Sequence, residues 1–103
     1  ETTPPPPFLF HVWEDVGGLL WTYSLVADAR WEPGIPLRPS LAEWSRRTFD
    51  MVVEVLDPAR GKVLAKTKSE RMGPVCGAPL MYRMDETPDG DTRLTIVRPV
   101  LRR

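Results

Sequence analysis

The segment from Phe49 to Ser69, with the sequence FDMVVEVLDPARGKVLAKTKS, constrains the fold of this chain more than any other part. Branched apolar residues recur in both of its halves, as is typical of paired β-strands. The middle, DPARG, has the chemistry of a turn, because Pro58 fixes the backbone angle φ of the first turn position and Gly61 can adopt a left-handed conformation. The segment therefore predicts a β-hairpin.

Alternation of side chains predicts the register of this hairpin. The register that keeps apolar residues together and opposes unlike charges gives these pairs: Leu56 with Leu64, Val55 with Ala65, Glu54 with Lys66, and Val53 with Thr67. One face is then apolar and the other carries charge, and a slip by one residue would exchange the two faces. A sheet of this kind is expected to pack against the rest of the protein on one side only.

Other segments extend the β pattern on both sides of the hairpin. Further strands are predicted at Phe8–Trp13, Leu19–Ala27, Pro79–Met84 and Thr92–Val97. Polar residues separate the last two of these strands, and Asp89-Gly90 is a typical hairpin turn. The predicted fold class is therefore all-β, with an antiparallel sheet of five to six strands.

A long connection separates the second predicted strand from the hairpin. It runs from Asp28 to Thr48, is rich in proline, and contains Ser40-Leu41-Ala42-Glu43, which has the form of a helix capping box. We expect one short helix here, from Leu41 to about Arg47. The chain is long enough for one small domain, which we place at residues 8–103, after a proline-rich arm or linker at residues 1–7.

Composition argues against nucleic-acid binding, a membrane span and a disulfide framework. Lys and Arg number 14, and so do Asp and Glu, so the net charge is zero and gives no electrostatic case for nucleic acid or an anionic membrane surface. No apolar run approaches the ~20 residues that span a bilayer, so no membrane span is expected. A single cysteine excludes an internal disulfide framework.

Few residues are candidates for a functional site. His11 is followed closely by Glu14 and Asp15, but strand geometry sends His11 and Glu14 to opposite faces, and a second histidine or cysteine ligand is missing. We therefore predict no catalytic residue, no metal site and no cofactor, and keep His11 as a weak binding candidate. Trp31 and Trp44 flank the proline-rich connection and are binding candidates too, because exposed aromatic rings can stack on a sugar or on a partner. For both residues, packing the connection down is the favoured interpretation.

The turn from Asp85 to Asp91, DETPDGD, is acidic. Oxygen-rich loops of this kind can hold calcium, but the full calcium-loop spacing is absent. Aspartate followed by glycine also favours a turn for conformational reasons alone. We read the segment as a turn first and leave the calcium alternative open.

The order of these segments resembles a known family. The strings WTYSLVADARW, FDMVVEVLDPARGKVLAKTKS and LMYRMDETPDGDTRLTIVRPVL follow one another over residues 18–100. Val53 to Pro58, Gly61, Val63 to Ala65 and Tyr82 match a hairpin pattern and an aromatic strand found in the last blade region of bacterial six-bladed β-propeller-like (NHL/TolB-like) proteins. The resemblance implies a four-stranded blade unit. The chain departs from that family because it holds little more than one blade, and because it carries an insertion from Trp31 to Arg47.

The resemblance implies a function without naming a ligand. We expect a non-enzymatic, propeller-blade-like binding or scaffold module of an exported bacterial protein, with a protein partner that contacts the long connection and the loops at one sheet end. One alternative is a fragment of a hydrolase-like propeller enzyme, which would need His11, Glu14 and Asp15 gathered at one end of the sheet. The other is a small β domain that self-associates through its sheet edges, with Phe8–Trp13 as the pairing edge.

Overall fold

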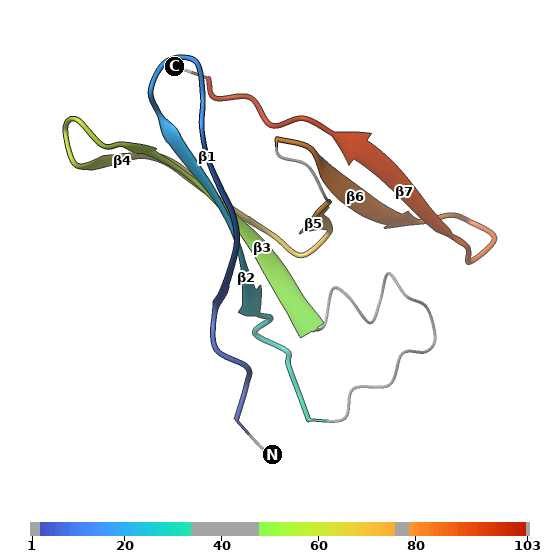
Figure 1. Ribbon diagram of the computed structural model, residues 1–103. Coiled ribbons are helices and arrows are strands. Elements are labelled where there is room, and N and C mark those ends of the chain that lie inside the picture. Colours follow the sequence, from blue (N-terminus) through green and yellow to red (C-terminus); the bar gives the residue numbers. More distant parts are fainter. Residues whose placement is uncertain (1–2, 34–47, 76–78, 103) are drawn as a thin grey trace.

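A computed structural model describes residues 3–33, 48–75 and 79–102 of the chain. Figure 1 shows two antiparallel sheets, the first with four strands and the second with three. In chain order the strands are β1 (Phe8–Glu14), β2 (Leu20–Ala27), β3 (Phe49–Asp57), β4 (Lys62–Ser69), β5 (Met72–Pro74), β6 (Met81–Glu86) and β7 (Thr92–Val97). The predicted all-β antiparallel class is confirmed. In the part of the chain that the structure describes, no helix is long and apolar enough to cross a membrane.

The first sheet is a simple meander, in which each strand pairs with the next one along the chain. Its centre is the pairing of β2 with β3, which runs without a register shift from Leu20 opposite Leu56 to Ala27 opposite Phe49. Both strands are rich in branched and aromatic residues, which favour the pleated backbone. Within the part of the chain that the structure describes, the outer strands β1 and β4 are each paired along one edge.

The strands are more numerous than predicted, and they are divided between two sheets. The additional strand is β5, which has only three residues and pairs Gly73 with Tyr82 and Pro74 with Met81. Its sequence, Met-Gly-Pro, has no strand pattern of its own, so the pairing with β6 forms it rather than local propensity. The predicted helix from Leu41 to about Arg47 lies outside the described residues.

The hairpin register is confirmed for three of the predicted pairs, which are Val55 with Ala65, Glu54 with Lys66, and Val53 with Thr67. The predicted pairing of Leu56 with Leu64 is wrong, because Leu56 pairs with Val63 and a β-bulge leaves Leu64 as the extra residue.

The turn at the end of this hairpin explains the bulge. At the start of the turn, the side-chain oxygen Asp57 Oδ1 accepts hydrogen bonds from the backbone N–H groups of Ala59 (3.1 Å) and Arg60 (3.3 Å). Gly61 has a φ of 64°, in the left-handed region where glycine has no steric cost. This turn pairs Asp57 with Lys62, and the bulge then absorbs the one residue by which that pairing differs from the register farther along the strands.

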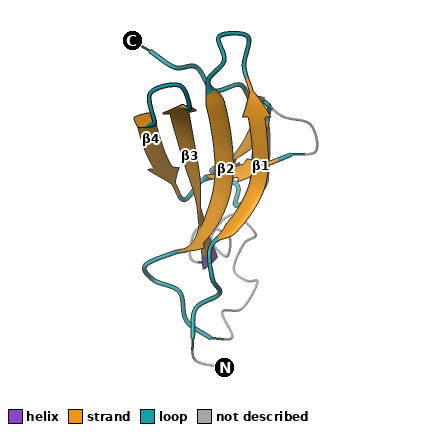
Figure 2. Cartoon of the chain, turned by 60° about the vertical axis from the view of Figure 1, so that its left-hand side comes forward, coloured by secondary structure: helices purple, strands orange, loops and turns teal. Residues whose placement is uncertain are grey.

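The core lies between the two sheets. Tyr23, Met51 and Met81 form one buried cluster, and Met72 and Val97 of the second sheet pack against it. A neighbouring cluster contains Leu19, Trp21 and Val55. The second sheet thus covers one face of the first sheet, whereas the view in Figure 2 looks onto the other face with β1 to β4 in front. This arrangement confirms that the first sheet packs on one side.

Aromatic rings pack against one another at the end of the core nearest the β1–β2 turn. Trp13 and Trp21 stack with their ring centroids 5.3 Å apart, and Trp13 meets Tyr23 edge to face at 4.7 Å. The carboxylate of Asp15 stabilises the β1–β2 turn. Its Oδ2 accepts a hydrogen bond from Trp21 Nε1–H (2.9 Å), and its Oδ1 accepts one from the backbone N–H of Gly17 (2.8 Å). The tryptophans that fall in strands therefore belong to the core.

Gly73 is required by the ring of Tyr82, which crosses it from the paired strand. A Cβ atom at position 73 would lie 2.1 Å from Tyr82 Cζ. Replacing Gly73 with alanine is therefore expected to cost about 1–3 kcal/mol of unfolding free energy, measured by urea denaturation. In a Tyr82→Ala background the clash is absent, and the same replacement should cost less than about 1 kcal/mol. Equal costs in the two backgrounds would show that the ring does not set the requirement.

Candidate functional site

Of the predicted binding residues, His11 and Trp31 make separate contacts. His11 faces the second sheet, where its Nε2 donates a hydrogen bond to the carbonyl oxygen of Val75 (2.9 Å) and its ring meets Tyr23 edge to face. Trp31 is half-buried, and its backbone N–H donates to the carbonyl oxygen of Asp28 (3.0 Å). Its ring lines an open hollow together with residues 3–6 of the proline-rich arm. Trp44 lies outside the described residues.

His11, Glu14 and Asp15, the residues named for an enzyme site, have separate environments. His11 is tied to Val75, Glu14 is exposed at the end of β1, and Asp15 holds the turn and Trp21. In the described ranges, the one group of three acidic or metal-binding side chains with ligand atoms within 4.8 Å of one another lies elsewhere. The structure therefore gives no support to a site built from His11, Glu14 and Asp15.

The acidic segment after β6 has the hydrogen bonds of a turn. The backbone N–H of Gly90 donates to the carbonyl oxygen of Thr87 (2.9 Å), and that of Asp91 donates to Thr87 Oγ1 (3.1 Å). Asp85 is neutralised by Arg83 Nε at 3.0 Å and by an Arg71 nitrogen at 3.6 Å. These contacts account for the segment as a turn.

An apolar hollow of about 150 Å³ opens beside the C-terminal segment, which packs Leu101 against the cluster around Trp21 and Val55. Ligand sites in proteins usually measure about 300–1,000 Å³. The hollow is smaller than that range and is lined mainly by apolar side chains, so it reads as an imperfection of the core.

The free edge of β1 carries an apolar strip, which we define as Phe8, Leu9, Phe10 and Val12. Their exposed fractions are 59%, 56%, 40% and 53%, respectively. A β-bulge makes Phe10 the extra residue between Leu9 and His11, so that apolar side chains reach both faces of the strand. At the opposite margin of the sheet, β4 exposes Lys62, Lys66 and Lys68. Figure 2 shows these two strands as the margins of the sheet.

A second feature is an acidic cluster, which we define as Asp28, Asp50 and Glu70. One oxygen from each carboxylate lies within 4.8 Å of the others. Strand pairing brings them together, because Val26 pairs with Asp50 and the backbone N–H of Asp28 then donates to the carbonyl oxygen of Thr48 (3.1 Å). Asp28 and Asp50 are thus diagonal neighbours on one face. Glu70 follows β4 at the same end of the sheet.

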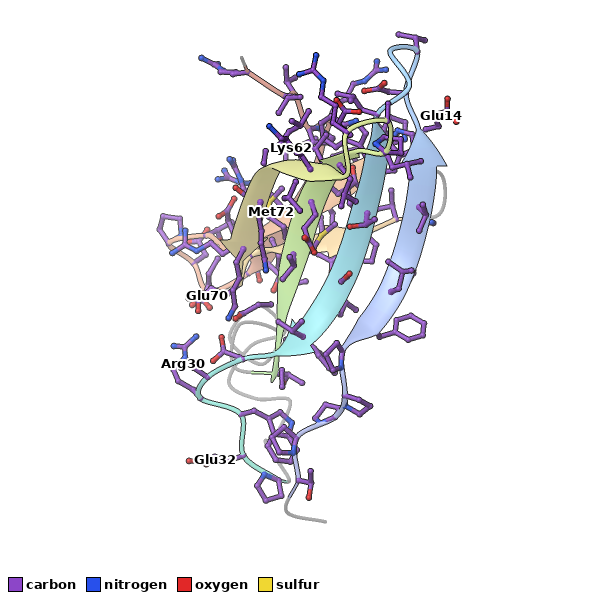
Figure 3. All side chains as sticks on the ribbon, turned by 90° about the vertical axis from the view of Figure 1, so that its left-hand side faces the viewer. Glu14, Arg30, Glu32, Lys62, Glu70 and Met72 are labelled. Carbon is purple, nitrogen blue, oxygen red and sulfur yellow. The ribbon has the colours of Figure 1, made fainter. Side chains whose placement is uncertain are left out.

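Two cations contact the acidic cluster. Arg30 bridges two of its members, because Nε donates to Asp28 Oδ1 (3.0 Å) and Nη2 donates to Glu70 Oε2 (2.7 Å). Lys68 Nζ lies 3.5 Å from Asp50 Oδ2. Figure 3 shows Arg30 and Glu70 at the end of the first sheet that is remote from Glu14. Burial is deepest at the aspartates, which are 6% (Asp28) and 5% (Asp50) exposed.

The two aspartates have opposite electrostatic environments. Burial raises the pKa of Asp50 to about 6, and the neighbouring Asp28 carboxylate contributes to that rise. Burial also acts to raise the pKa of Asp28, but the hydrogen bonds from Arg30 outweigh it, and the net pKa of Asp28 is lowered. Asp28 is therefore the ionised partner of Arg30, and Asp50 is the member of the pair that holds a proton more readily.

Sequence reasoning missed the acidic cluster. Asp28 was read as the start of a connection, and Asp50 lay inside the hairpin arm without a noted role. The available signal was parity, since a charged residue at position 50 interrupts the apolar run of β3 on the face that also carries Glu54. The carboxylates could bridge a cation, but Arg30 and Lys68 already supply positive charge.

Comparison with known proteins returns no relative of this chain. No protein-family model, no curated protein and no solved structure matches it. The resemblance to a propeller blade therefore stays a prediction.

Arg30 is expected to stabilise the cluster as its bridging cation. Replacing Arg30 with methionine leaves the buried Asp28 carboxylate without its strongest partner, and should cost about 1–3 kcal/mol of unfolding free energy in urea denaturation. Arg60→Met is the matched control, because Arg60 also pairs with an aspartate but its side chain is 75% exposed. The control should cost no more than about 0.5 kcal/mol. Equal effects of the two replacements would contradict a bridging role for Arg30.

Proposed function

We propose that this chain is a non-enzymatic binding or scaffold module, and that it assembles with a second copy of itself along the free edge of β1. The observation that carries the proposal is the apolar strip of Phe8, Leu9, Phe10 and Val12 on an edge strand. An unpaired strand edge offers backbone N–H and C=O groups to another strand, and exposed apolar side chains add burial to that pairing.

The contrast between the two margins of the first sheet supports this assignment. Lysines on an edge strand oppose pairing, because they would have to lose water and approach one another. β4 exposes Lys62, Lys66 and Lys68, whereas the only Asp, Glu, Lys or Arg residue in β1 is Glu14 at its end. One margin is thus protected by charge and the other is not.

A second copy of the chain suits this edge for reasons of charge and symmetry. Two β1 strands related by a two-fold axis would run antiparallel and present the same residues to each other. Glu14 would then face an apolar residue near the start of the partner strand, and no like charges would be opposed. The bulge at Phe10 bends the edge, so pairing would run over the short segments on either side of it.

The propeller-blade part of the proposal rests on topology. Four antiparallel strands in sequence order are the arrangement of a propeller blade, and β1 to β4 follow that order. A blade is stabilised by packing its faces against neighbouring blades, and the first sheet has one face covered by β5 to β7 and one face without a second sheet among the described residues. This supports a scaffold role for the unit, and the resemblance adds the expectation of a bacterial, exported protein.

The edge proposal makes a prediction about mass in solution. Static light scattering over a range of concentrations should give about twice the chain mass of 11.7 kDa. Val12→Lys should reduce the mass to that of one chain, because a lysine in the strip opposes strand pairing. The matched control is Val63→Lys at the β4 margin, since Val63 and Val12 are 54% and 53% exposed.

The control variant should keep the mass of the unchanged chain. A single-chain mass for the unchanged protein at every concentration would refute the assembly. Equal loss of mass in both variants would mean that lysine acts through general charge and not through the β1 edge.

Export gives a separate prediction. Expressed from its complete native gene, the protein should be found outside the cytoplasm when cell fractions are probed with an antibody against this segment. A cytoplasmic marker enzyme, probed in the same fractions, controls for leakage. Finding both proteins only in the cytoplasmic fraction would contradict export and leave the edge proposal intact.

A further inference from the structure

We propose that Asp28 and Asp50 form a carboxyl–carboxylate pair that shares one proton, and that loss of this proton loosens the junction where β2, β3 and β4 meet. The pair is a pH-sensitive element of the fold and is independent of the β1 edge.

The register forces the two carboxyl groups together. Asp50 pairs with Val26, and Asp28 lies two residues farther along the chain, just past the end of β2, where its N–H donates to the carbonyl oxygen of Thr48; both side chains thus point to the same face. Met51 pairs with Ser69, the last residue of β4, so Glu70 directly after β4 lies next to Asp50. Like charges at such positions repel each other in a sheet. The backbone therefore holds three acidic side chains where ionised carboxylates are unfavourable.

One buried oxygen atom of the cluster lacks a hydrogen-bond donor among the described residues. Asp50 Oδ1 is fully buried and has no hydrogen-bond partner among the described residues, although the other oxygen of the same carboxylate lies 3.5 Å from Lys68 Nζ. A buried oxygen without a donor is costly, by about 1–3 kcal/mol for a typical polar group. A proton on the Asp28–Asp50 pair removes that cost, because the protonated carboxyl donates a hydrogen bond to the ionised one.

The charges of the cluster agree with one shared proton. Among the residues that the structure describes, three carboxylates face two cations, Arg30 and Lys68, so one negative charge in this set remains uncompensated when all groups are ionised. A proton on the aspartate pair brings the cluster to neutrality. The positive groups around Asp50 are Lys68 from β4 and Arg30 from the chain after β2, and the negative ones are Asp28 and Glu70.

A bound divalent cation is the competing explanation, and the contacts argue against it. Arg30 already joins Asp28 to Glu70 through two charge-assisted hydrogen bonds. A metal ion among the same oxygens would have to sit beside the guanidinium of Arg30 and the ammonium of Lys68. A proton carries less charge, needs no coordination sphere and leaves these ion pairs in place.

The direction of the pKa shifts sets the pH window. The pKa of Asp50 is raised to about 6 by burial and by Asp28, so the folded state holds its proton above about pH 4, where the unfolded chain has lost it. Stability supplied by this group is complete below about pH 4 and is lost as the pH rises to about 6. The pKa of Asp28 is lowered, so its contribution to folding stability depends on pH in the opposite direction. That stability is present at higher pH and is lost only in stronger acid.

The junction links parts of the chain that are far apart in sequence. Arg30 and Trp31 begin the connection after β2, whereas Glu70 leads from β4 into the second sheet. When the shared proton leaves, all three carboxylates are ionised and repel one another. The ion pairs with Arg30 and Lys68 then oppose a larger repulsion. Neutral pH therefore weakens the attachment of both segments to the end of the first sheet.

The test compares thermal unfolding of three variants at about pH 4 and about pH 7.5. In Asp50→Asn, the amide imitates the protonated carboxyl and can donate to Asp28 at any pH. Its Tm should match the unchanged protein at the lower pH and exceed it by about 5 °C at the higher pH. Asp28→Asn removes the ionised partner of Arg30 and should lower Tm at both values. Asp89→Asn, in an exposed turn, controls for the loss of one negative charge.

A titration of the unchanged protein makes the test independent of any variant. With ¹³C-labelled aspartate, the carboxyl resonance of Asp50 should titrate near pH 6. Titration near the ordinary value of about 4 would overturn the proposal. So would an equal Tm gain for Asp50→Asn and Asp89→Asn at the higher pH. Stabilisation by added calcium or manganese that disappears in Asp50→Asn would also overturn it, because the occupant would then be a cation.

Discussion

The uninterrupted pairing of β2 with β3 is the constraint on which the rest of the structure depends. It places Tyr23, Met51 and Val55 on one face, where they can be buried only if a second layer covers them. The three strands after the hairpin provide that layer. The same pairing carries Asp28 and Asp50 to one end of the opposite face. The hydrophobic core and the acidic cluster are therefore two results of a single register.

The part of the fold that depends on local chemistry could be predicted from the sequence. Asp57, Pro58 and Gly61 encode the hairpin turn, and alternating side chains encode most of its register. The pairing of Leu56 with Val63, and not with Leu64, could not be predicted, because the geometry of the turn decides where the bulge lies. The strand at Gly73 was missed for a similar reason, since it exists only through its pairing with Tyr82.

The candidate sites were less predictable than the fold. The exposed edge at Phe8–Trp13 followed from strand order, because a first strand with one neighbour has a free side. The acidic cluster needed the register of three strands at once. Asp28 and Glu70 lie more than forty residues apart in the chain, and nothing near either of them in sequence points to the other. His11 was singled out because histidine is chemically versatile, and its place is a structural one against Val75.

The seam between the two sheets is made largely of methionine. Met51 comes from the first sheet, and Met72 and Met81 come from the second. Methionine is unbranched and polarizable, and it fills irregular gaps through many side-chain conformations. Hydrogen bonds fix the strands within each sheet, and His11 and Tyr23 also donate hydrogen bonds across the seam, but the methionine contacts between the layers can readily adjust. Small sliding movements of one sheet over the other therefore leave no holes in the core, and the two layers can adapt to each other while each keeps its own register.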